Sequence, residues 1–175
     1  VLNHLNVEFS KALWNFASAR KIPFVYASSA ATYGDGSQGY DDSEDKIHSL
    51  KPLNAYGESK QRFDLWALEQ EHAGRKPPSW AGFKFFNVFG YGERHKGFMA
   101  SVVLHAFDEI RNQGKTKLFK SHREGIADGH QKRDFIFVDD LIEVLHFAIE
   151  TPVTRGIYNL GTWGARTFLD LCRAV

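Results

Sequence analysis

A short apolar run that ends in two serines, residues 24–29, most constrains how this chain of 175 residues can fold. An apolar run of this length with a polar end is typical of a buried parallel strand whose carboxyl end faces a site. Similar runs recur along the chain, and helix-like patterns separate them. This alternation predicts an α/β fold with a largely parallel sheet. The predicted strands are 24–29, 82–90, 117–119, 133–138 and 156–161, and the predicted helices are 6–20, 56–71, 99–111 and one that Asp139 or Asp140 caps and that ends at Glu150.

Composition narrows the class of protein. Hydrophobic residues make up 43% of the chain and charged residues 25%, as in ordinary globular proteins. The net charge of +1 comes from interspersed signs, so we expect no nucleic-acid partner. No apolar stretch approaches the roughly 20 residues that a membrane-spanning helix needs, so we expect no membrane partner. The single cysteine, Cys172, fits a reducing compartment, and we predict a cytoplasmic location.

The two ends of the chain suggest a fragment. Val1 is not Met and lies inside a helical pattern, and Val175 lies inside what reads as another helix. We therefore interpret the chain as part of a longer protein, and we expect the isolated 175 residues to be inactive and poorly soluble.

The segment Tyr56-Gly57-Glu58-Ser59-Lys60 carries the clearest chemistry. Residues four apart lie on one face of a helix, so Tyr56 and Lys60 are expected to be neighbours. An ammonium beside a phenol favours the phenolate and makes the phenol an acid/base catalyst. A serine hydroxyl at the end of the strand before this helix can hold a reacting oxygen.

Four motifs together resemble the extended short-chain dehydrogenase/reductase family. They are Tyr-Ala-Ser-Ser-Ala-Ala-Thr-Tyr-Gly (26–34), Tyr-Gly-Glu-Ser-Lys (56–60), Phe-Phe-Asn-Val-Phe-Gly (85–90) and Arg-Asp-Phe-Ile-Phe-Val-Asp-Asp (133–140). The resemblance implies a partial Rossmann-like doubly wound parallel sheet with part of a smaller substrate-binding region. It assigns residues 1–90 and 133–150 to the cofactor-binding domain, and 91–132 and 151–175 to the substrate-binding region.

The same resemblance implies roles for the first two motifs. Tyr56 would be the general acid/base, Lys60 would assist it and contact the cofactor ribose, and Ser29 would be the catalytic serine. Related sugar dehydratases carry an acidic pair where this chain has Ala30 and Ala31. Dehydration is therefore disfavoured.

Within the family, residues 95–102 resemble the segment that carries a second acid/base lysine in nucleotide-heptose 6-epimerases. This likeness implies an NADP-dependent isomerase that inverts C6 of an ADP-linked heptose for lipopolysaccharide synthesis, with NAD as a possible cofactor. Lys96 would act as the second acid/base group, because one tyrosine cannot easily serve both faces of the reacting carbon. A nucleotide-sugar substrate and a homo-oligomer, as a pentamer, are also implied.

The remaining site residues are carried over by position. The implied cofactor-binding set is Asn6, Ser28, Tyr56, Lys60, Val88 and Lys96. The implied substrate-binding set is Ser29, Asn87, Phe98, His105, Phe119, Lys120, Ser121, His122 and Arg133. Several have a simpler reading: Asn6 as an ordinary helix residue, Asn87 as a turn cap, and His105 as a packed histidine.

Several features leave alternatives open. The stretch 34–39 has the letters of a dinucleotide fingerprint, but a polar acidic loop follows it where a helix is required, so we interpret it as a loop. The histidines and aspartates of 121–132 lack metal-ligand spacing, and no metal is predicted. Phe98 and Trp163 depart from the family pattern, which leaves the sugar specificity open. A UDP-sugar 4-epimerase, which would not need Lys96, and a non-functional fragment remain the alternatives.

Overall fold

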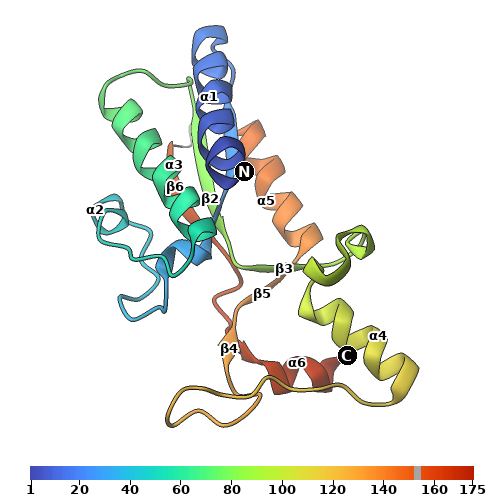
Figure 1. The fold of residues 1–175 in the computed structure, drawn as a ribbon. Helices are drawn as coiled ribbons and strands as arrows, with labels where there is room; N and C mark the ends of the chain where they lie inside the picture. Colours follow the sequence, from blue (N-terminus) through green and yellow to red (C-terminus); the bar gives the residue numbers. More distant parts are fainter. Residues whose placement is uncertain (152–154) are drawn as a thin grey trace. The chain divides into compact units, whose positions relative to one another are not determined.

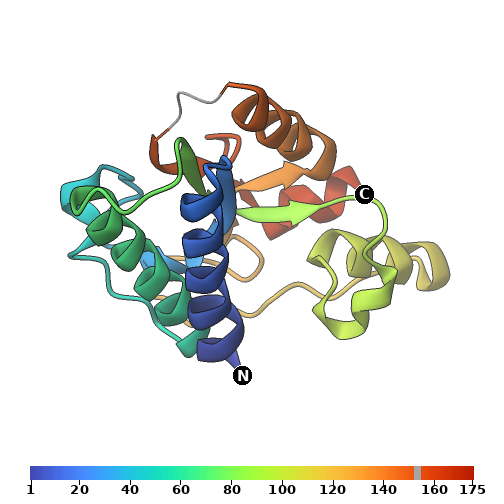
Figure 2. The same cartoon turned by 90° about the horizontal axis from the view of Figure 1, so that it is seen from above.

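The computed structural model describes residues 1–151 and 155–175, and it divides them into two compact units. Unit one comprises residues 1–85 and 143–160, and unit two comprises residues 86–142 and 161–175. Figures 1 and 2 show the ribbon of the chain coloured along the sequence. The predicted division at residue 151 adjoins residues 152–154, which lie outside the described residues.

Unit one is built on a three-stranded parallel sheet in the order β1-β2-β6. The strands are β1 (Phe24–Ser29), β2 (Trp80–Phe85) and β6 (Arg155–Leu160). Side chains alternate between the two faces of a sheet, and residues in register share a face. On one face the register runs from an aromatic row, Phe24 beside Trp80, to a polar row at the carboxyl end. That polar row consists of Ser28, Lys84 and Asn159.

Helices α1 (Phe9–Arg20) and α3 (Ala55–His72) pack against this face and lie side by side in Figures 1 and 2. The core between them and the sheet is aromatic. Trp14 has no exposed surface, and its ring meets Trp80 edge-on with 5.0 Å between centroids. Its indole nitrogen donates to the carbonyl of Arg75 at 2.9 Å, which satisfies the only polar atom of that side chain. The buried core cluster contains Trp14, Ile47, Phe63, Ala67, Leu68, Trp80 and Ile157.

Tyr26 lies in the middle row of the same face, beside Gly82. A Cβ added at Gly82 would lie 2.3 Å from the Tyr26 ring carbon Cζ. The glycine therefore leaves the space across which the Tyr26 ring lies, and the Tyr26 hydroxyl reaches Asp64 on α3 at 3.0 Å.

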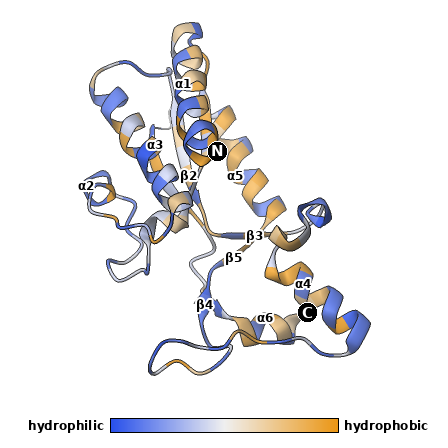
Figure 3. Ribbon diagram, in the orientation of Figure 1, coloured by the Kyte–Doolittle hydropathy of each residue, from blue (hydrophilic) through white to orange (hydrophobic). Residues whose placement is uncertain are grey.

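Shorter elements complete unit one. The chain begins with a π-helix, η1 (Asn3–Glu8), that continues into α1, so the predicted helix 6–20 begins earlier than expected. A 3-10 helix, η2 (Ala30–Tyr33), follows β1 directly, and the four-residue α2 (Glu44–Ile47) lies within the predicted loop 34–52. Helix α5 (Val138–Glu150) has its first residues in unit two and the remainder in unit one, and it is hydrophobic over most of its length (Figure 3).

Unit two contains two pairs of short strands. Strand β3 (Asn87–Phe89) pairs in parallel with β5 (Phe135–Phe137), and β4 (Lys132–Arg133) pairs antiparallel with β7 (Arg166–Thr167). Its helices are the 3-10 helix η3 (Arg94–Met99), α4 (Val102–Gln113) and α6 (Phe168–Ala174). Ser101 caps α4 by accepting the N–H of Leu104, and a capping box of Thr167 and Asp170 starts α6.

Five sequence predictions need correction. The predicted strand 133–138 is divided between β4 and β5, which pair in different sheets, and Val138 already belongs to α5. The predicted strand 82–90 breaks at Phe86, because β2 and β3 pair in different sheets. No strand forms at 117–119, where the chain has no pairing partner among the described residues. Asp139 and Asp140 do not cap α5 but lie in its first turn, where the helix dipole stabilises their negative charges. The predicted helix 99–111 is α4, which begins three residues later.

The aromatic core yields a stability prediction. Replacing Trp14 with Ala should lower the free energy of unfolding by about 3–5 kcal/mol, because a large buried side chain is lost and a cavity remains. Trp163→Ala is the matched control, because Trp163 is 80% exposed and should change stability little. Urea denaturation followed by far-ultraviolet circular dichroism measures both. Equal midpoints for the two variants would contradict the assignment of Trp14 to the core.

Candidate active site

Helix α3 places Tyr56, Lys60 and Asp64 in one row, because residues four apart share a helix face. The helix begins where Asn54 caps it by accepting the N–H of Gly57 at 2.8 Å. This cap fixes Tyr56 in the first turn, and 42% of its side chain is exposed. The row therefore runs from an exposed phenol to a fully buried carboxylate.

The structure brings the predicted pair Tyr56 and Lys60 together. The Lys60 ammonium lies 5.8 Å from the centroid of the Tyr56 ring and donates to the carbonyl of Ala27 on β1 at 2.9 Å. Burial lowers the pKa of Lys60 below its ordinary value, and the negative charge of Asp64 opposes this shift. An ammonium with further N–H donors beside an exposed phenol is a donor set suited to a ribose diol.

Ser28 and Ser29 follow one another at the end of β1, but their hydroxyl groups have different partners. Ser28 is buried and donates its proton to Oδ2 of Asp64 at 2.6 Å. Ser29 Oγ instead accepts the N–H of Ala31 at 3.1 Å, which leaves its own proton available for donation. A hydroxyl has one proton, so Ser29 can hold a reacting oxygen as a donor, whereas Ser28 cannot while it is bound to Asp64.

Gly57 lets the turn after β1 approach α3. A Cβ at this position would lie 2.6 Å from the carbonyl oxygen of Ala31, a backbone atom that cannot easily move. Any larger residue would separate η2, which follows Ser29, from the first turn of α3, which carries Tyr56. The glycine between Tyr56 and Glu58 is therefore required by this close approach.

Asn6 lies in the π-helix η1 and reaches the same turn of α3. Its side-chain nitrogen donates to Ser59 Oγ at 2.9 Å, and Ser59 donates to the carbonyl of Tyr56 at 2.7 Å. π-helical turns are rare and occur frequently at functional sites. The structure places Asn6 at the site as a support for the first turn of α3; its contact with a cofactor stays a prediction.

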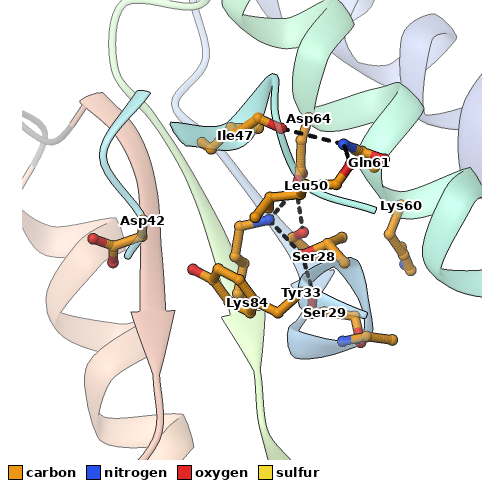
Figure 4. A network of polar contacts seen from close by, with 12 residues as sticks. Ser28, Ser29, Tyr33, Asp42, Ile47, Leu50, Lys60, Gln61, Asp64 and Lys84 are labelled. Atoms are coloured by element: carbon orange, nitrogen blue, oxygen red, sulfur yellow. Dashed lines mark hydrogen bonds and ion pairs between the residues drawn. The ribbon is translucent and has the colours of Figure 1, made fainter. Parts of the chain in front are cut away.

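Sequence reasoning missed a buried ion pair below this row. Lys84 Nζ lies 2.8 Å from Oδ2 of Asp64, and neither side chain has exposed surface (Figure 4). Lys84 also donates to Thr32 Oγ1 at 2.8 Å, and its ammonium lies 5.3 Å from the centroid of the Tyr33 ring. The available signal was a single lysine inside an apolar strand, together with an acidic residue four positions after Lys60.

The loop with the fingerprint-like glycines is fixed to the sheet rather than opening a helix. The Tyr33 hydroxyl donates to Asn159 Oδ1 at 2.8 Å, and the Asn159 side chain donates to the carbonyl of Tyr40 at 2.6 Å. The Asn159 backbone N–H also donates to Asp42. Gln61 on α3 closes the other end of the loop by donating to the carbonyls of Ile47 and Leu50 (Figure 4). The interpretation of 34–39 as a loop agrees with the structure.

Lys96 lies in unit two on η3, the segment that precedes α4. Two carboxylate contacts hold this segment. Glu93 accepts the backbone N–H and the hydroxyl of Ser101 at 2.8 and 2.6 Å, and Arg94 binds both oxygens of Asp108 at 2.8 and 2.9 Å. Phe98, a predicted substrate contact, is 90% exposed.

A pocket of about 260 Å³ lies within unit two between α4, α6 and the segment 116–119. Two predicted substrate residues, His105 and Phe119, line it together with Phe168 and Cys172. His105 is exposed, and its contact with substrate stays a prediction. Burial and the nearby Glu109 raise the pKa of the Cys172 thiol, which favours its neutral form.

The other predicted residues of unit two lie on its short strands and loops. Asn87 donates its backbone and side-chain N–H groups to the carbonyl of Asp134, each at 3.0 Å, and Val88 pairs with Ile136. The Arg133 guanidinium lies 5.9 Å from the centroid of the Phe168 ring, beside the pocket. Three further residues occupy the segment before β4: the exposed Lys120 and His122, and Ser121, whose backbone N–H donates to Asp128.

Two absences concern the described residues. Within 1–151 and 155–175, no helix combines the length and apolar character that crossing a bilayer requires. In the same part of the chain, no three histidine, cysteine or acidic side chains gather as a metal site would require.

A family model described as the NAD dependent epimerase/dehydratase family matches residues 2–161. A protein of Fusobacterium nucleatum named ADP-L-glycero-D-manno-heptose-6-epimerase is 48% identical over 171 residues, which are 97% of this chain and 51% of that protein. A relative of the same name from Nitratidesulfovibrio vulgaris is 46% identical over 170 residues, with the same coverage. The chain thus spans about half the length of the curated relatives it matches.

Solved structures agree. The Helicobacter pylori ADP-L-glycero-D-manno-heptose-6-epimerase is 30% identical with a TM-score of 0.73, over 89% of this chain and 44% of that one. A UDP-N-acetylglucosamine 4-epimerase from Methanobrevibacter ruminantium has a TM-score of 0.77 at 23% identity, over 96% of this chain and 50% of that one. The second likeness shows the fold alone. The predicted Rossmann-like α/β class is confirmed.

The burial of Lys60 gives a pH prediction. In the unfolded chain its pKa returns to the ordinary 10.5, so between the lowered pKa and 10.5 the unfolded chain binds more protons. Wild-type stability should therefore rise with pH across this window, relative to Lys60→Met. Denaturation midpoints measured from neutral pH upward test this, with the exposed Lys115→Met as the control whose curve should stay parallel to wild type. A parallel curve for Lys60→Met would contradict the burial of the ammonium.

Proposed function

The chain belongs to the NAD dependent epimerase/dehydratase family, and on that premise we propose that its protein is an NADP-dependent ADP-L-glycero-D-manno-heptose 6-epimerase. The proposed activity is that of the whole protein, because the match covers only about half the length of the relatives. The observation that carries the proposal is the pairing of Tyr56 with Lys60. The Lys60 ammonium lies 5.8 Å from the Tyr56 ring centroid and binds the carbonyl of Ala27, two residues before Ser29. The relatives' names support the choice of substrate.

The residues of unit one would act at a single carbinol group. Ser29 would donate its free hydroxyl proton to the reacting oxygen, and Tyr56 would take the proton of the sugar hydroxyl. The Lys60 ammonium would stabilise the phenolate and hold the ribose of the cofactor. The bound nicotinamide supplies the acceptor and later the donor of hydride. Removal of hydride and proton would leave a transient ketone at C6 of the heptose. The ketone would then turn over in the pocket, so that hydride returns to its other face.

Inversion requires a proton donor at the second face of that ketone. The proposal assigns this role to Lys96, because one phenol cannot easily serve both faces. The contacts of Glu93 and Arg94 that fix η3 support it, because a general acid must be held in place to be effective. The reaction would exchange one configuration for the other, ADP-D-glycero- and ADP-L-glycero-D-manno-heptose, and would leave the cofactor unchanged.

The turn after β1 supports epimerisation over dehydration. Water elimination needs an acid beside the catalytic serine, and η2 begins with Ala30 and Ala31. The backbone N–H of Ala31 is used to orient Ser29 Oγ. Dehydratases share this fold, as a dTDP-glucose 4,6-dehydratase with a TM-score of 0.76 illustrates, so the side chains of this turn carry the distinction.

Further parts of the proposal rest on the relatives. We infer NADP as the cofactor, with NAD as the alternative because structural neighbours were solved with NAD. A role in lipopolysaccharide synthesis, a cytoplasmic location and a pentameric assembly belong to the same proposal. Residues 1–90 and 133–150 would form the cofactor side, and the remaining segments would form the substrate side.

Two substitutions test the proposed roles. In the protein from the complete reading frame, Tyr56→Phe and Lys96→Ala should each lower kcat for ADP-heptose epimerisation by about 10²–10⁴-fold, the usual contribution of a general acid or base. Product configuration at C6, measured by NMR, is the readout. Lys115→Ala, an exposed lysine in the same unit, is the control and should keep wild-type turnover.

Assays with two different substrates separate the 6-epimerase from the 4-epimerase alternative. Wild-type protein should convert ADP-heptose and leave UDP-glucose unchanged. Conversion of UDP-glucose alone, with Lys96→Ala at wild-type rate, would contradict the proposal and favour a 4-epimerase.

A further inference from the structure

Both members of the buried ion pair of unit one, Lys84 and Asp64, have further hydrogen-bond partners. Lys84 donates to Asp64 and to Thr32, each at 2.8 Å. Asp64 accepts Ser28 and Lys84 on Oδ2, and it accepts the Tyr26 hydroxyl on Oδ1 at 3.0 Å. Burial and the adjacent carboxylate raise the pKa of Tyr26 well above its ordinary value, so its hydroxyl remains a donor.

Fold stability alone does not account for such a pair. Removing two charges from water costs several kcal/mol per ion, and well-packed apolar residues often serve a fold equally well. A buried pair can instead select one arrangement of the elements that it joins. Here it joins the end of β1, the turn η2, strand β2 and helix α3 (Figure 4).

Two hydrogen-bonded paths lead from the pair to the candidate catalytic groups. On one path Lys84 donates to Thr32 Oγ1, and Thr32 donates to the backbone carbonyl of Ser29 at 2.9 Å. On the other path, the Ser28 hydroxyl donates a hydrogen bond to Asp64. Ser28 lies between Ala27, whose carbonyl accepts from Lys60, and Ser29. The pair is therefore linked to the Ser28 side chain directly and to the Ser29 backbone through Thr32.

We propose that Asp64 and Lys84 are positioning residues. They hold the end of β1, and with it Ser29 and the carbonyl that binds Lys60, in the position that the reaction at Tyr56 requires. The inference deepens the proposed function and rests on it for its kinetic consequence. Neither residue would touch substrate or cofactor. Their effect would pass through Thr32 and Ser28 to the end of β1.

The first experiment cuts one path and leaves the ion pair in place. Thr32→Val preserves shape but removes the hydroxyl between Lys84 and the Ser29 carbonyl, and Thr32→Ser restores it. The Ala31 amide, bound to Ser29 Oγ, reports the position of Ser29 through hydrogen exchange. We expect Thr32→Val to speed Ala31 exchange about tenfold or more, because both hydrogen bonds of the Thr32 hydroxyl are lost, and Thr32→Ser to restore the wild-type rate.

Tyr26→Phe is the matched control. It removes one hydrogen bond from the same carboxylate, but from Oδ1, and leaves both paths to Ser29 intact. Ala31 exchange and kcat should stay within about twofold of wild type. In Thr32→Val, kcat for ADP-heptose should fall about tenfold or more with KM nearly unchanged, because a misplaced catalytic group lowers kcat selectively.

A second variant removes both charges. Asp64→Leu with Lys84→Met leaves no uncompensated ion and should keep the thermal midpoint near wild type. Ala31 exchange should nevertheless rise and kcat should fall. A folded double variant with wild-type exchange and kcat would overturn the proposal. If that variant does not fold, the pair Thr32→Val and Thr32→Ser decides the question alone.

The outcomes separate this inference from the proposed function. Wild-type protein that does not epimerise ADP-heptose would refute the function, while Ala31 exchange would still judge the positioning. Unchanged Ala31 exchange in Thr32→Val would overturn the positioning whatever the activity. Faster exchange with unchanged kcat would also overturn it, because Ser29 would then move without consequence for the reaction.

Discussion

Lys84 and Asp64 form an ion pair with no access to water, and the hydrogen bonds around the end of β1 converge on it. Lys84 lies in the polar row at the carboxyl end of the sheet, where apolar packing from the aromatic core stops, and Asp64 binds it from α3. Without opposite charges to satisfy one another, neither group could be buried at this level. The pair thus places specific polar links between α3, β2 and the end of β1, next to the candidate catalytic groups.

The geometry of the site results from two periodicities that meet at this row. The sheet places Ser28, Lys84 and Asn159 in register on one face. Tyr56, Lys60 and Asp64 are four residues apart on one face of α3. Asp64 can therefore bind the sheet while Tyr56 and Lys60 remain nearer the surface. Gly57 and Gly82 remove the two side chains that would keep helix, turn and strand apart. Small residues at these contacts are as necessary to the site as the reactive ones.

Local pattern predicted much of this arrangement, and tertiary contacts account for what it missed. The pairing of Tyr56 with Lys60 follows from helical spacing alone, so it was predictable. The partner of Lys84 is 20 residues away in sequence, and no local signal gives that distance. The break between β2 and β3 was missed for the same reason, since a continuous apolar run does not reveal that its two halves pair with different strands. The different hydrogen-bond partners of the Ser28 and Ser29 hydroxyl groups could not be predicted either, because the sequence does not show that Asp64 lies beside Ser28.

A similar principle operates in unit two, where the candidate acid/base lysine lies on a turn rather than a long helix. An isolated surface lysine has large rotational freedom, and ordering it costs free energy. The backbone on the N-terminal side of Lys96 is held by Arg94 with Asp108, and Glu93 joins the start of η3 to the cap of α4. Between these contacts Gly97 adopts a φ of 55°, a left-handed conformation that a residue with a side chain would adopt only with strain. The backbone of the turn is therefore held by contacts on both sides of Lys96, and proton transfer would still have to order the exposed Lys96 side chain.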